Sequence, residues 1–298
     1  MSLTKKILAA AAALPLIAVL AGCAGSAGDA EKGTEDNPVK IGVVGASDPY
    51  WEIYKKAAAD EGISVDIVDF TEYPQPNPAL SEGEIDLNQF QHIVYLGQYN
   101  EASGEDLVPV GATAIYPLAL YSTKYDSVKD IEKGDTVAIP NDESNLSRAL
   151  LVLQSAGLVE LKDGGSIFST VDDVDTEKST VKVTTLEASL TATSLPDVAA
   201  AIINNDFVAD AGLTFDDAIA QDDPADANAL PYVNIFAARA EDKDNETFKK
   251  LVSIYQDTKT VTDAVQENSG GTAVFVKTPV SDLQSSLDKV QADIKAKG

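Results

Sequence analysis

The sequence is poor in the side chains that most often carry out chemistry. Its 298 residues include one histidine, His92, and one cysteine, Cys23. A single cysteine cannot form a disulfide within the chain, so core packing must stabilise the fold. No set of cysteines and histidines is available to hold zinc or haem. The patterns Gly-x-Ser-x-Gly, Gly-x-Gly-x-x-Gly and the P-loop are absent, so an enzyme is unsupported, and we predict no metal and no cofactor.

Basic residues are also scarce. Lysine and arginine number 22 against 48 aspartates and glutamates, which gives a net charge of −26 at pH 7. Such a surface repels nucleic acid and anionic lipid, so neither is expected to bind through electrostatic attraction. Solubility is the simplest reason for the acidic excess. Among so many carboxylates, a catalytic pair for glycoside chemistry cannot be singled out.

An uncharged apolar run lies at the N-terminus. Lys5 and Lys6 precede the run from Ile7 to Leu20, and Leu-Ala-Gly stands directly before Cys23. This is a secretory signal, residues 1–22, with an apolar core too short for a stable membrane span. Its ending resembles a bacterial lipobox, in which the cysteine is lipidated and becomes the first residue after cleavage. An ordinary signal peptide would leave a free thiol on an exported protein, so we predict lipidation.

Residues 23–38 are small, polar and acidic, which is the composition of a flexible tether. We therefore expect folding to begin near Val39. Cleavage before Cys23 would leave 276 residues, enough for two domains of modest size. Removing Lys5 and Lys6 leaves 20 basic residues against 48 acidic ones, a net charge near −28.

Strands and helices alternate along the rest of the chain. Residues 39–47 form the continuous apolar run of a buried parallel strand, 48–62 are helical, and 63–70 form a second strand. This order predicts a crossover unit on a parallel sheet. The pattern indicates an α/β fold in two lobes, with ligands bound near the carboxyl ends of strands.

Further elements complete the pattern. We predict strands at 135–140, 206–212 and 232–240, and helices at 144–157, 195–205 and 245–268. The helix at 144–157 is expected to begin at a serine or asparagine cap.

The C-terminal segment predicts one more helix. Val280, Leu283, Leu287, Val290 and Ile294 fall on one face of it. We expect this face to pack against the parent lobe, with a partner contact as the alternative.

Aromatic and amide side chains stand at the ends of the predicted elements, namely Tyr73, Phe90, His92, Tyr95, Tyr116 and Asn234. Aromatic residues in loops beside proline and glycine often line ligand pockets, but the same residues are ordinary core components. For His92 the residues alone leave open a core histidine bonded to a backbone carbonyl, a pocket residue, or the base of a serine triad.

Three segments carry a resemblance to a known family: "EIDLNQFQHIVYL", "YPLALYSTKYDSVKDIEKGDTVAIPNDESNLSRALLVLQSAGLVELKDG" and "ADAGLTFDDAIAQDDPADANALPYVN". They resemble the NlpA/MetQ family of lipoproteins, the binding components of methionine ABC importers, over Val39 to about Gly271. The resemblance implies a two-lobed, periplasmic-binding-protein-like fold of type II with a ligand cleft between the lobes. The first lobe would comprise 39–118 and 235–298, and the second lobe 119–234.

The resemblance also implies a set of ligand-binding residues: Tyr73, Phe90, His92, Tyr95, Arg148, Asn204 and Asn234. Arg148 matches the arginine that meets the ligand carboxylate, to which it can give a bidentate, charge-assisted pair. The two asparagines match those that hold the ligand's amino and carboxyl groups. His92 is then a flat wall against an apolar or thioether side chain, and neither an acid nor a base.

Two departures from the family pattern concern the substrate. Ile93 and Val94 stand where the family has a residue and then proline, and Thr193 stands where it has an arginine. We expect both places to lie near the cleft, where they could change the preferred side chain.

The resemblance implies a lipid-anchored, extracytoplasmic substrate-binding protein at the cell membrane. It would deliver an L-amino acid, with methionine as the first candidate, to the permease and ATPase of an ABC importer. The alternatives are another amino acid or a short peptide in the same fold, a surface lipoprotein hydrolase that uses His92 as its base, and a lipoprotein scaffold without a transport role.

Overall fold

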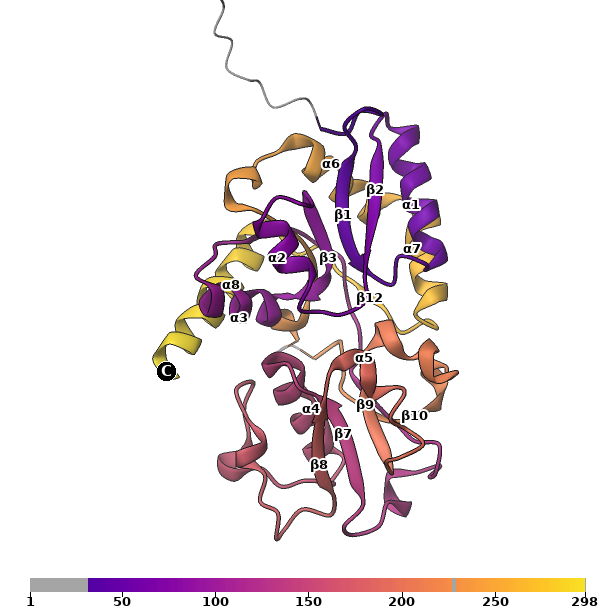
Figure 1. Ribbon diagram of the computed structural model, residues 1–298, viewed down its shortest axis with the longest axis vertical. Helices are drawn as coiled ribbons and strands as arrows, with labels where there is room; N and C mark the ends of the chain where they lie inside the picture. Colours follow the sequence, from indigo (N-terminus) through magenta and orange to yellow (C-terminus); the bar gives the residue numbers. More distant parts are fainter. Residues whose placement is uncertain (1–31, 227–228, 298) are drawn as a thin grey trace, which may run out of the picture. The chain divides into compact units, whose positions relative to one another are not determined.

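The structure is a computed structural model that describes residues 32–226 and 229–297. The predicted signal peptide, residues 1–22, and the predicted lipidation site Cys23 lie outside the described residues. From Lys32 onward the chain forms one compact unit (Figure 1).

The described end of the predicted tether, residues 32–38, is attached to this unit. Lys32 Nζ lies 2.9 Å from Oδ1 of the buried Asp86. The backbone N–H of Ser64 donates to the carbonyl oxygen of Gly33 at 2.7 Å, and Gly33 is buried with a φ of +92°. Composition alone predicted that residues 32–38 are flexible. Main-chain hydrogen bonds and one ion pair nevertheless attach this segment to the folded unit.

The strands of the described residues form three sheets. The first has the order β2 (Val65–Phe70), β1 (Val39–Val44), β3 (Leu87–His92), β11 (Asn234–Ala238) and β4 (Val108–Ala112). The second has the order β10 (Ala218–Gln221), β6 (Ala119–Tyr121), β9 (Ala200–Ile203), β7 (Thr136–Pro140) and β8 (Lys182–Leu186). A two-stranded sheet pairs β12 (Val274–Phe275) with β5 (Ala114–Ile115).

The helices are α1 (Pro49–Asp60), α2 (Pro76–Ser81), α3 (Ile93–Ser103), α4 (Glu143–Ser155), α5 (Ala188–Thr191), α6 (Glu246–Asp257), α7 (Lys259–Asn268) and α8 (Val280–Lys297). Short 3₁₀ turns lie between several of these elements.

The crossover unit predicted at the start of the fold is confirmed. β1 and β2 pair in parallel, and α1 lies between them in the sequence. β1 also pairs in parallel with β3. α1 begins at Pro49, where a missing N–H costs nothing, and buries Trp51, Tyr54 and Ala58 on one face. The predicted strand at β11 and the predicted helices at α6 and α7 are confirmed as well.

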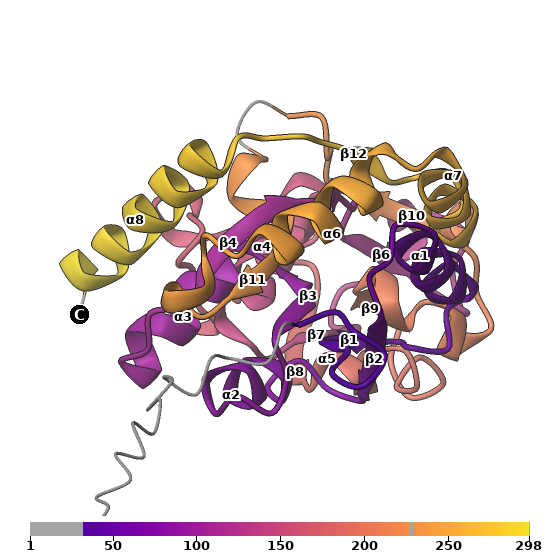
Figure 2. The same cartoon turned by 90° about the horizontal axis from the view of Figure 1, so that it is seen from above.

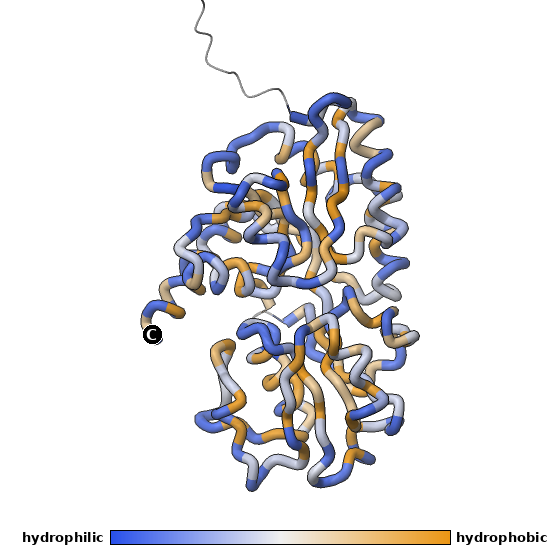
Figure 3. The backbone as a smooth tube through the Cα atoms, viewed as in Figure 1, coloured by the Kyte–Doolittle hydropathy of each residue, from blue (hydrophilic) through white to orange (hydrophobic). Residues whose placement is uncertain are grey.

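Helices cover both faces of the first sheet (Figure 2). One apolar cluster joins the sheet to α1, α6 and α7, and a second joins it to α2, α3 and α8. Figure 3 shows hydrophobic residues along the strands of both large sheets. The first sheet is therefore buried on both sides, as expected for parallel strands.

The C-terminal helix α8 packs against its own lobe. This is what we expected from the sequence, where a partner contact was the alternative. Leu283, Leu287 and Val290 are buried against α3, whereas Val280 is 46% exposed. Gly97 of α3 permits the close approach, because a Cβ at this position would stand 2.8 Å from Cγ1 of Val290.

Two predictions for the second lobe were wrong. Residues 195–205 were expected to be helical, but 200–203 form the central strand β9, and the expected strand at 206–212 consists of 3₁₀ turns. β9 is alanine-rich and favours a helix by intrinsic propensity, yet all four residues are buried between β6 and β7. Tertiary burial overrides propensity in this segment.

The strand β7 and the helix α4 were predicted correctly, but the cap of α4 was not. Asp142 is the N-cap residue, and its side chain accepts the backbone N–H of Asn145 at 2.9 Å. The helix therefore begins earlier than the predicted serine or asparagine cap.

The chain crosses between the two large sheets at residues 113–118 and again after β10, where 222–226 and 229–233 are described. A mixed apolar cluster joins the lobes, with Tyr73 and Phe90 from the first lobe and Tyr121, Ile203 and Phe207 from the second. The fold is the two-lobed α/β arrangement that was predicted.

Candidate ligand-binding site

A small cavity lies between residues of the two lobes. It is lined by Tyr73, Phe90, Gln91, His92, Tyr95, Tyr116, Pro117, Leu118, Asn145, Arg148, Asn204, Asn205 and Asn234. All seven residues that were predicted to bind a ligand are among them. The structure thus brings together side chains from β3, α3, α4, β11 and the turn after β9.

An aromatic wall forms where β3 ends and α3 begins. The ring centroids of Phe90 and Tyr95 lie 5.5 Å apart, and Tyr73 lies 5.8 Å from Phe90 and 6.1 Å from Tyr95. Phe90 and His92 are two positions apart on a strand, so their side chains share one face. These spacings are those of favourable aromatic pairs, and the three rings support one another.

His92 is buried and acts as the N-cap residue of α3. Its Nδ1 accepts the backbone N–H of Tyr95 at 3.2 Å, and its Nε2 lies 3.5 Å from Oδ1 of Asn145 on the other lobe. Its ring meets the edge of Tyr232 at a centroid distance of 5.3 Å. Burial, followed by the positive charge of Arg148, lowers the pKa of His92 to about 3, so the imidazole is neutral at physiological pH.

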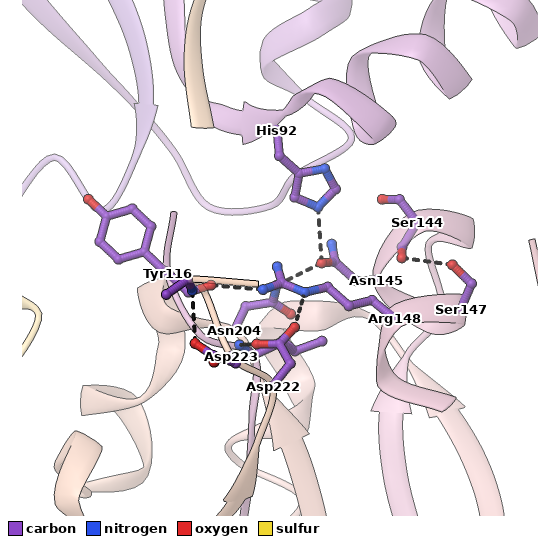
Figure 4. A network of polar contacts seen from close by, with 11 residues as sticks. His92, Tyr116, Ser144, Asn145, Ser147, Arg148, Asn204, Asp222 and Asp223 are labelled. Carbon is purple, nitrogen blue, oxygen red and sulfur yellow. Dashed lines mark hydrogen bonds and ion pairs between the residues drawn. The ribbon is translucent and has the colours of Figure 1, made fainter. Parts of the chain in front are cut away.

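Arg148 is buried on α4 and held on two sides. Its Nε–H donates to Oδ2 of Asp222 at 2.6 Å, and its Nη2 donates to the carbonyl oxygen of Tyr116 at 2.8 Å (Figure 4). The guanidinium carbon lies 4.4 Å from the ring centroid of Tyr232, a cation–π distance. A guanidinium has five N–H donors, so most of them remain available to a ligand in the cavity.

Asn145 connects the two lobes, and Asn204 leaves one acceptor free. Asn204 Nδ2 donates to Oδ1 of Asn145 at 3.0 Å, and the same Oδ1 faces His92. Asn204 is only 7% exposed, and its Oδ1 has no hydrogen-bond partner. A buried carbonyl oxygen without a partner is costly, so this atom is suited to accept a donor from a bound molecule.

The cavity encloses only about 20 Å³. That is room for one water molecule and not for an amino acid. An amino acid can enter only if the lobes separate or if the side chains that bridge them move, Asn145 above all.

The two departures from the family pattern do not line the cavity, contrary to expectation. Ile93 and Val94 are fully buried in the core between β3, α3 and α8. Thr193 is exposed after α5, where its hydroxyl donates to the carbonyl oxygen of Leu190. These positions therefore give no reason to expect a different side-chain preference.

A larger cavity of about 260 Å³ adjoins the first and shares Phe90, Tyr116, Asn205 and Asn234 with it. Four carboxylates line this second cavity, those of Asp48, Asp206, Asp216 and Glu267, and no lysine, arginine or histidine is among its lining residues. The two cavities therefore differ in charge although they share a wall.

Two of these carboxyl groups are perturbed. Burial raises the pKa of Asp206 to about 7, against the hydrogen bond that Tyr73 Oη donates to it at 2.8 Å, and the charge of Asp48 adds to the rise. Burial likewise raises the pKa of Asp48 to about 6, against its hydrogen bond with Asn268.

The described part of the chain has neither a metal-binding cluster nor a helix that could span a membrane. No group of three or more histidine, cysteine, aspartate or glutamate side chains is placed to hold a metal ion. No described helix is long and apolar enough to cross a membrane.

The two lobes and the pocket between them define the class of two-lobed substrate-binding proteins. A family model described as NlpA lipoprotein matches residues 39–276. The chain belongs to this family, as the resemblance in its sequence predicted.

Relatives and solved structures agree with this assignment. The D-methionine-binding lipoprotein MetQ of Yersinia pestis is 42% identical over 279 residues, which cover 92% of this chain and 99% of the relative. The substrate binding protein of a methionine transporter from Streptococcus pneumoniae is 36% identical with a TM-score of 0.74, covering 80% of this chain and 95% of that one. A nutrient binding protein from Burkholderia cenocepacia, solved with methionine bound, is 37% identical with a TM-score of 0.74 and covers 80% and 99%.

Sequence reasoning missed three residues of the site, Asn145, Asp222 and Tyr232. Asn145 lies three positions before Arg148, hence on the same face of α4, and this spacing was a usable signal. Asp222 and Tyr232 lie in the second crossing segment, and only the path of that segment brings them to Arg148.

Proposed function

We propose that this protein is the substrate-binding component of an ABC importer and that its substrate is methionine. Relatives that match nearly the whole chain are named for methionine binding or for methionine transporters. The seven cavity residues, Tyr73, Phe90, His92, Tyr95, Arg148, Asn204 and Asn234, are proposed to bind it. The proposed lobes are residues 39–118 with 235–298, and residues 119–234.

One observation carries the proposal: a single cavity combines a buried arginine, a buried acceptor without a partner and an aromatic wall. Arg148 can pair with the carboxylate, and Asn204 Oδ1 can accept from the ammonium group. Each charge of a zwitterion is costly to bury unless it is paired, so both contacts are needed. The rings of Phe90, His92 and Tyr95 can pack against a thioether, which makes favourable contacts with aromatic edges.

Binding is proposed to couple to lobe closure. The aromatic residues belong to the first lobe, whereas Arg148 and Asn204 belong to the second. A ligand can contact both sets only when the lobes are closed, so it shifts the population toward the closed form. The crossing segments are the proposed hinge, namely 113–118 and, among the described residues of the second crossing, 222–226 and 229–233.

The hydrolase alternative is not favoured. The cavity lining contains no serine, threonine or cysteine that could act as nucleophile beside His92. Both ring nitrogens of His92 face other groups, and its lowered pKa makes it a weak base. We propose that the protein carries out no covalent chemistry.

Mass spectrometry of ligand released from denatured protein tests the substrate. Methionine is the expected ligand. Calorimetric titration of ligand-stripped protein should then give binding of methionine but not of methionine amide or N-acetylmethionine, because each blocked form leaves one charge-binding contact unused. Undiminished binding of the amide would contradict the proposed contact with Arg148.

We also propose that a lipid on Cys23 anchors the protein to the outer face of the cytoplasmic membrane, next to the permease and ATPase. Relatives are named lipoproteins, and Cys23 is the only cysteine. A Cys23→Ser variant should appear in the soluble fraction after detergent-free fractionation. If it remains with the membranes as the wild type does, another anchor is present.

A further inference from the structure

Asp222 stands beside Arg148, outside the lining of the small cavity, and connects it to both crossing segments. Its Oδ2 accepts the Nε–H of Arg148 at 2.6 Å, while its Oδ1 accepts the backbone N–H of Leu118 at 2.8 Å. Its own backbone N–H donates to the carbonyl oxygen of Leu118 at 3.2 Å. Two hydrogen bonds thus fix the carboxylate and a third fixes its backbone, and the carboxylate fixes one edge of the guanidinium (Figure 4).

The charges around the small cavity do not favour an anion once this pair is counted. Arg148 is the only charged residue in the lining, since His92 is neutral at physiological pH. Asp222 compensates it, with side-chain exposures of 7% for Arg148 and 27% for Asp222. The next ionisable groups, Asp142 bonded to Asn145 and Asp206 bonded to Tyr73, are carboxyl groups and add no positive charge.

We propose that Asp222 is a specificity-determining residue that restricts the site to zwitterions and excludes carboxylates without an ammonium group. The inference rests on the proposed function, because it states which charge form of an amino-acid-like ligand the same pocket accepts. Asp222 acts through Arg148, as a positioning residue, by occupying its Nε edge and leaving Nη1 and the second N–H of Nη2 for the ligand.

The physical reason is repulsion between two carboxylates on one guanidinium. A ligand carboxylate on the Nη groups would lie on the order of 6 Å from Asp222, a distance at which like charges in a partly buried site repel each other appreciably. The ligand's ammonium group offsets this repulsion, and Asn204 Oδ1 is the acceptor next to it. A ligand without that group brings a net negative charge to a site that is already balanced.

The test compares methionine with 4-(methylsulfanyl)butanoate, which has the same carboxylate and side chain but no ammonium group. Calorimetric titration gives the ratio of the two dissociation constants for wild type, Asp222→Asn and Asp222→Glu. We expect Asp222→Asn to lower the preference for methionine by roughly ten- to hundredfold, because the attraction between Asp222 and the ammonium group, which only methionine carries, disappears with the charge. Asp222→Glu keeps the charge and should keep most of the preference.

Asp223→Asn is the matched control, because it removes the same charge from the exposed neighbouring residue; its preference should equal that of the wild type. A preference unchanged in Asp222→Asn, or lowered equally in Asp223→Asn, overturns the role of Asp222 while methionine binding by the wild type still supports the proposed function. A wild type that binds neither compound overturns both. Circular dichroism checks folding, and Asp222→Ser replaces Asp222→Asn if the latter does not fold.

Discussion

The two adjoining cavities share four residues but solve the problem of buried charge differently. In the small cavity the one cation, Arg148, has a carboxylate partner in Asp222 and an aromatic face in Tyr232. In the large cavity the carboxylates of Asp48 and Asp206 have only hydroxyl and amide partners, and no cation lines the space.

This difference separates a site built for a ligand from one that responds to protons. The small cavity offers a ligand a cation that already has a fixed carboxylate partner. An unpaired buried carboxyl is displaced toward its neutral form, which places the pKa values of Asp48 and Asp206 at about 6 and about 7. We therefore expect substitutions in the small cavity to change affinity, and substitutions in the large cavity to change the dependence of stability on pH.

The largest expected effect is that of Arg148→Ala on ligand affinity. The variant leaves the ligand carboxylate unpaired in a water-poor cleft, and we expect a loss of about 3 to 5 kcal/mol, as when one partner of a buried charge pair is removed. Calorimetric titration with methionine measures it.

The control is the chain's other arginine, Arg239, which donates to the carbonyl oxygens of Leu80 and Ile85 and lines neither cavity. Arg239→Ala should lower the melting temperature and leave affinity unchanged. Wild-type affinity in Arg148→Ala would mean that the arginine does not meet the ligand and that the comparison of the two cavities has no bearing on binding.

Sequence reasoning succeeded where local pattern and final burial agree. The unit from β1 to β2 is such a case, because its apolar runs and its proline and glycine boundaries suit the buried parallel sheet they form. β9 is the opposite case, since its alanines favour a helix and only the neighbours β6 and β7 make it a strand. Whether residues 200–203 form a helix or a strand therefore depends on the neighbouring segments and not on their own sequence.

The site divides in the same way. The residues of "FQH" and of α4 could be proposed because a family motif covers them, and the structure brings them into one cavity. Asp222 lies in a segment with several other aspartates, where nothing in the sequence distinguishes it. Its contact with Arg148 depends on where the crossing segment passes, and so does the stacking of Tyr232.

A smaller effect is expected from His92. His92→Ala should weaken methionine binding by about 1 to 3 kcal/mol through lost aromatic packing, and His92→Phe should recover much of the loss. Because the pKa of His92 is lowered to about 3, affinity should not change between about pH 6 and 8. Titrations at several pH values measure this. An affinity that follows a single proton near the ordinary histidine pKa would show that the charge of His92 matters, and the small cavity would then share the pH sensitivity of the large one.

The smallest expected effect belongs to Asp206 and concerns stability. Its folded-state pKa, about 7, is raised above that of an unfolded aspartate, so the folded protein binds more protons between about pH 4 and 7. Its stabilising contribution is full below about pH 4 and is lost as the pH rises through about 7. Asp206→Asn cannot ionise and still offers an oxygen to the hydroxyl of Tyr73. We therefore expect it to exceed the wild type in stability by about 1 to 2 kcal/mol near pH 8, a value discounted for the part of the side chain that water still reaches, and to match it near pH 4.

Urea unfolding of both proteins across that pH range measures the difference between them. The two proteins must be compared with each other because both also contain His92, which affects stability in the opposite direction. Its lowered pKa gives stability above about pH 6.5 that is lost as the pH falls toward 3.

Asp48→Asn should behave like Asp206→Asn, except that the wild type loses the contribution of Asp48 as the pH rises through about 6. The double variant should gain less than the sum of the two single variants, since part of the rise at Asp206 comes from the charge of Asp48. A constant difference at all pH values would mean that the large cavity leaves these carboxylates as well solvated as any on the surface.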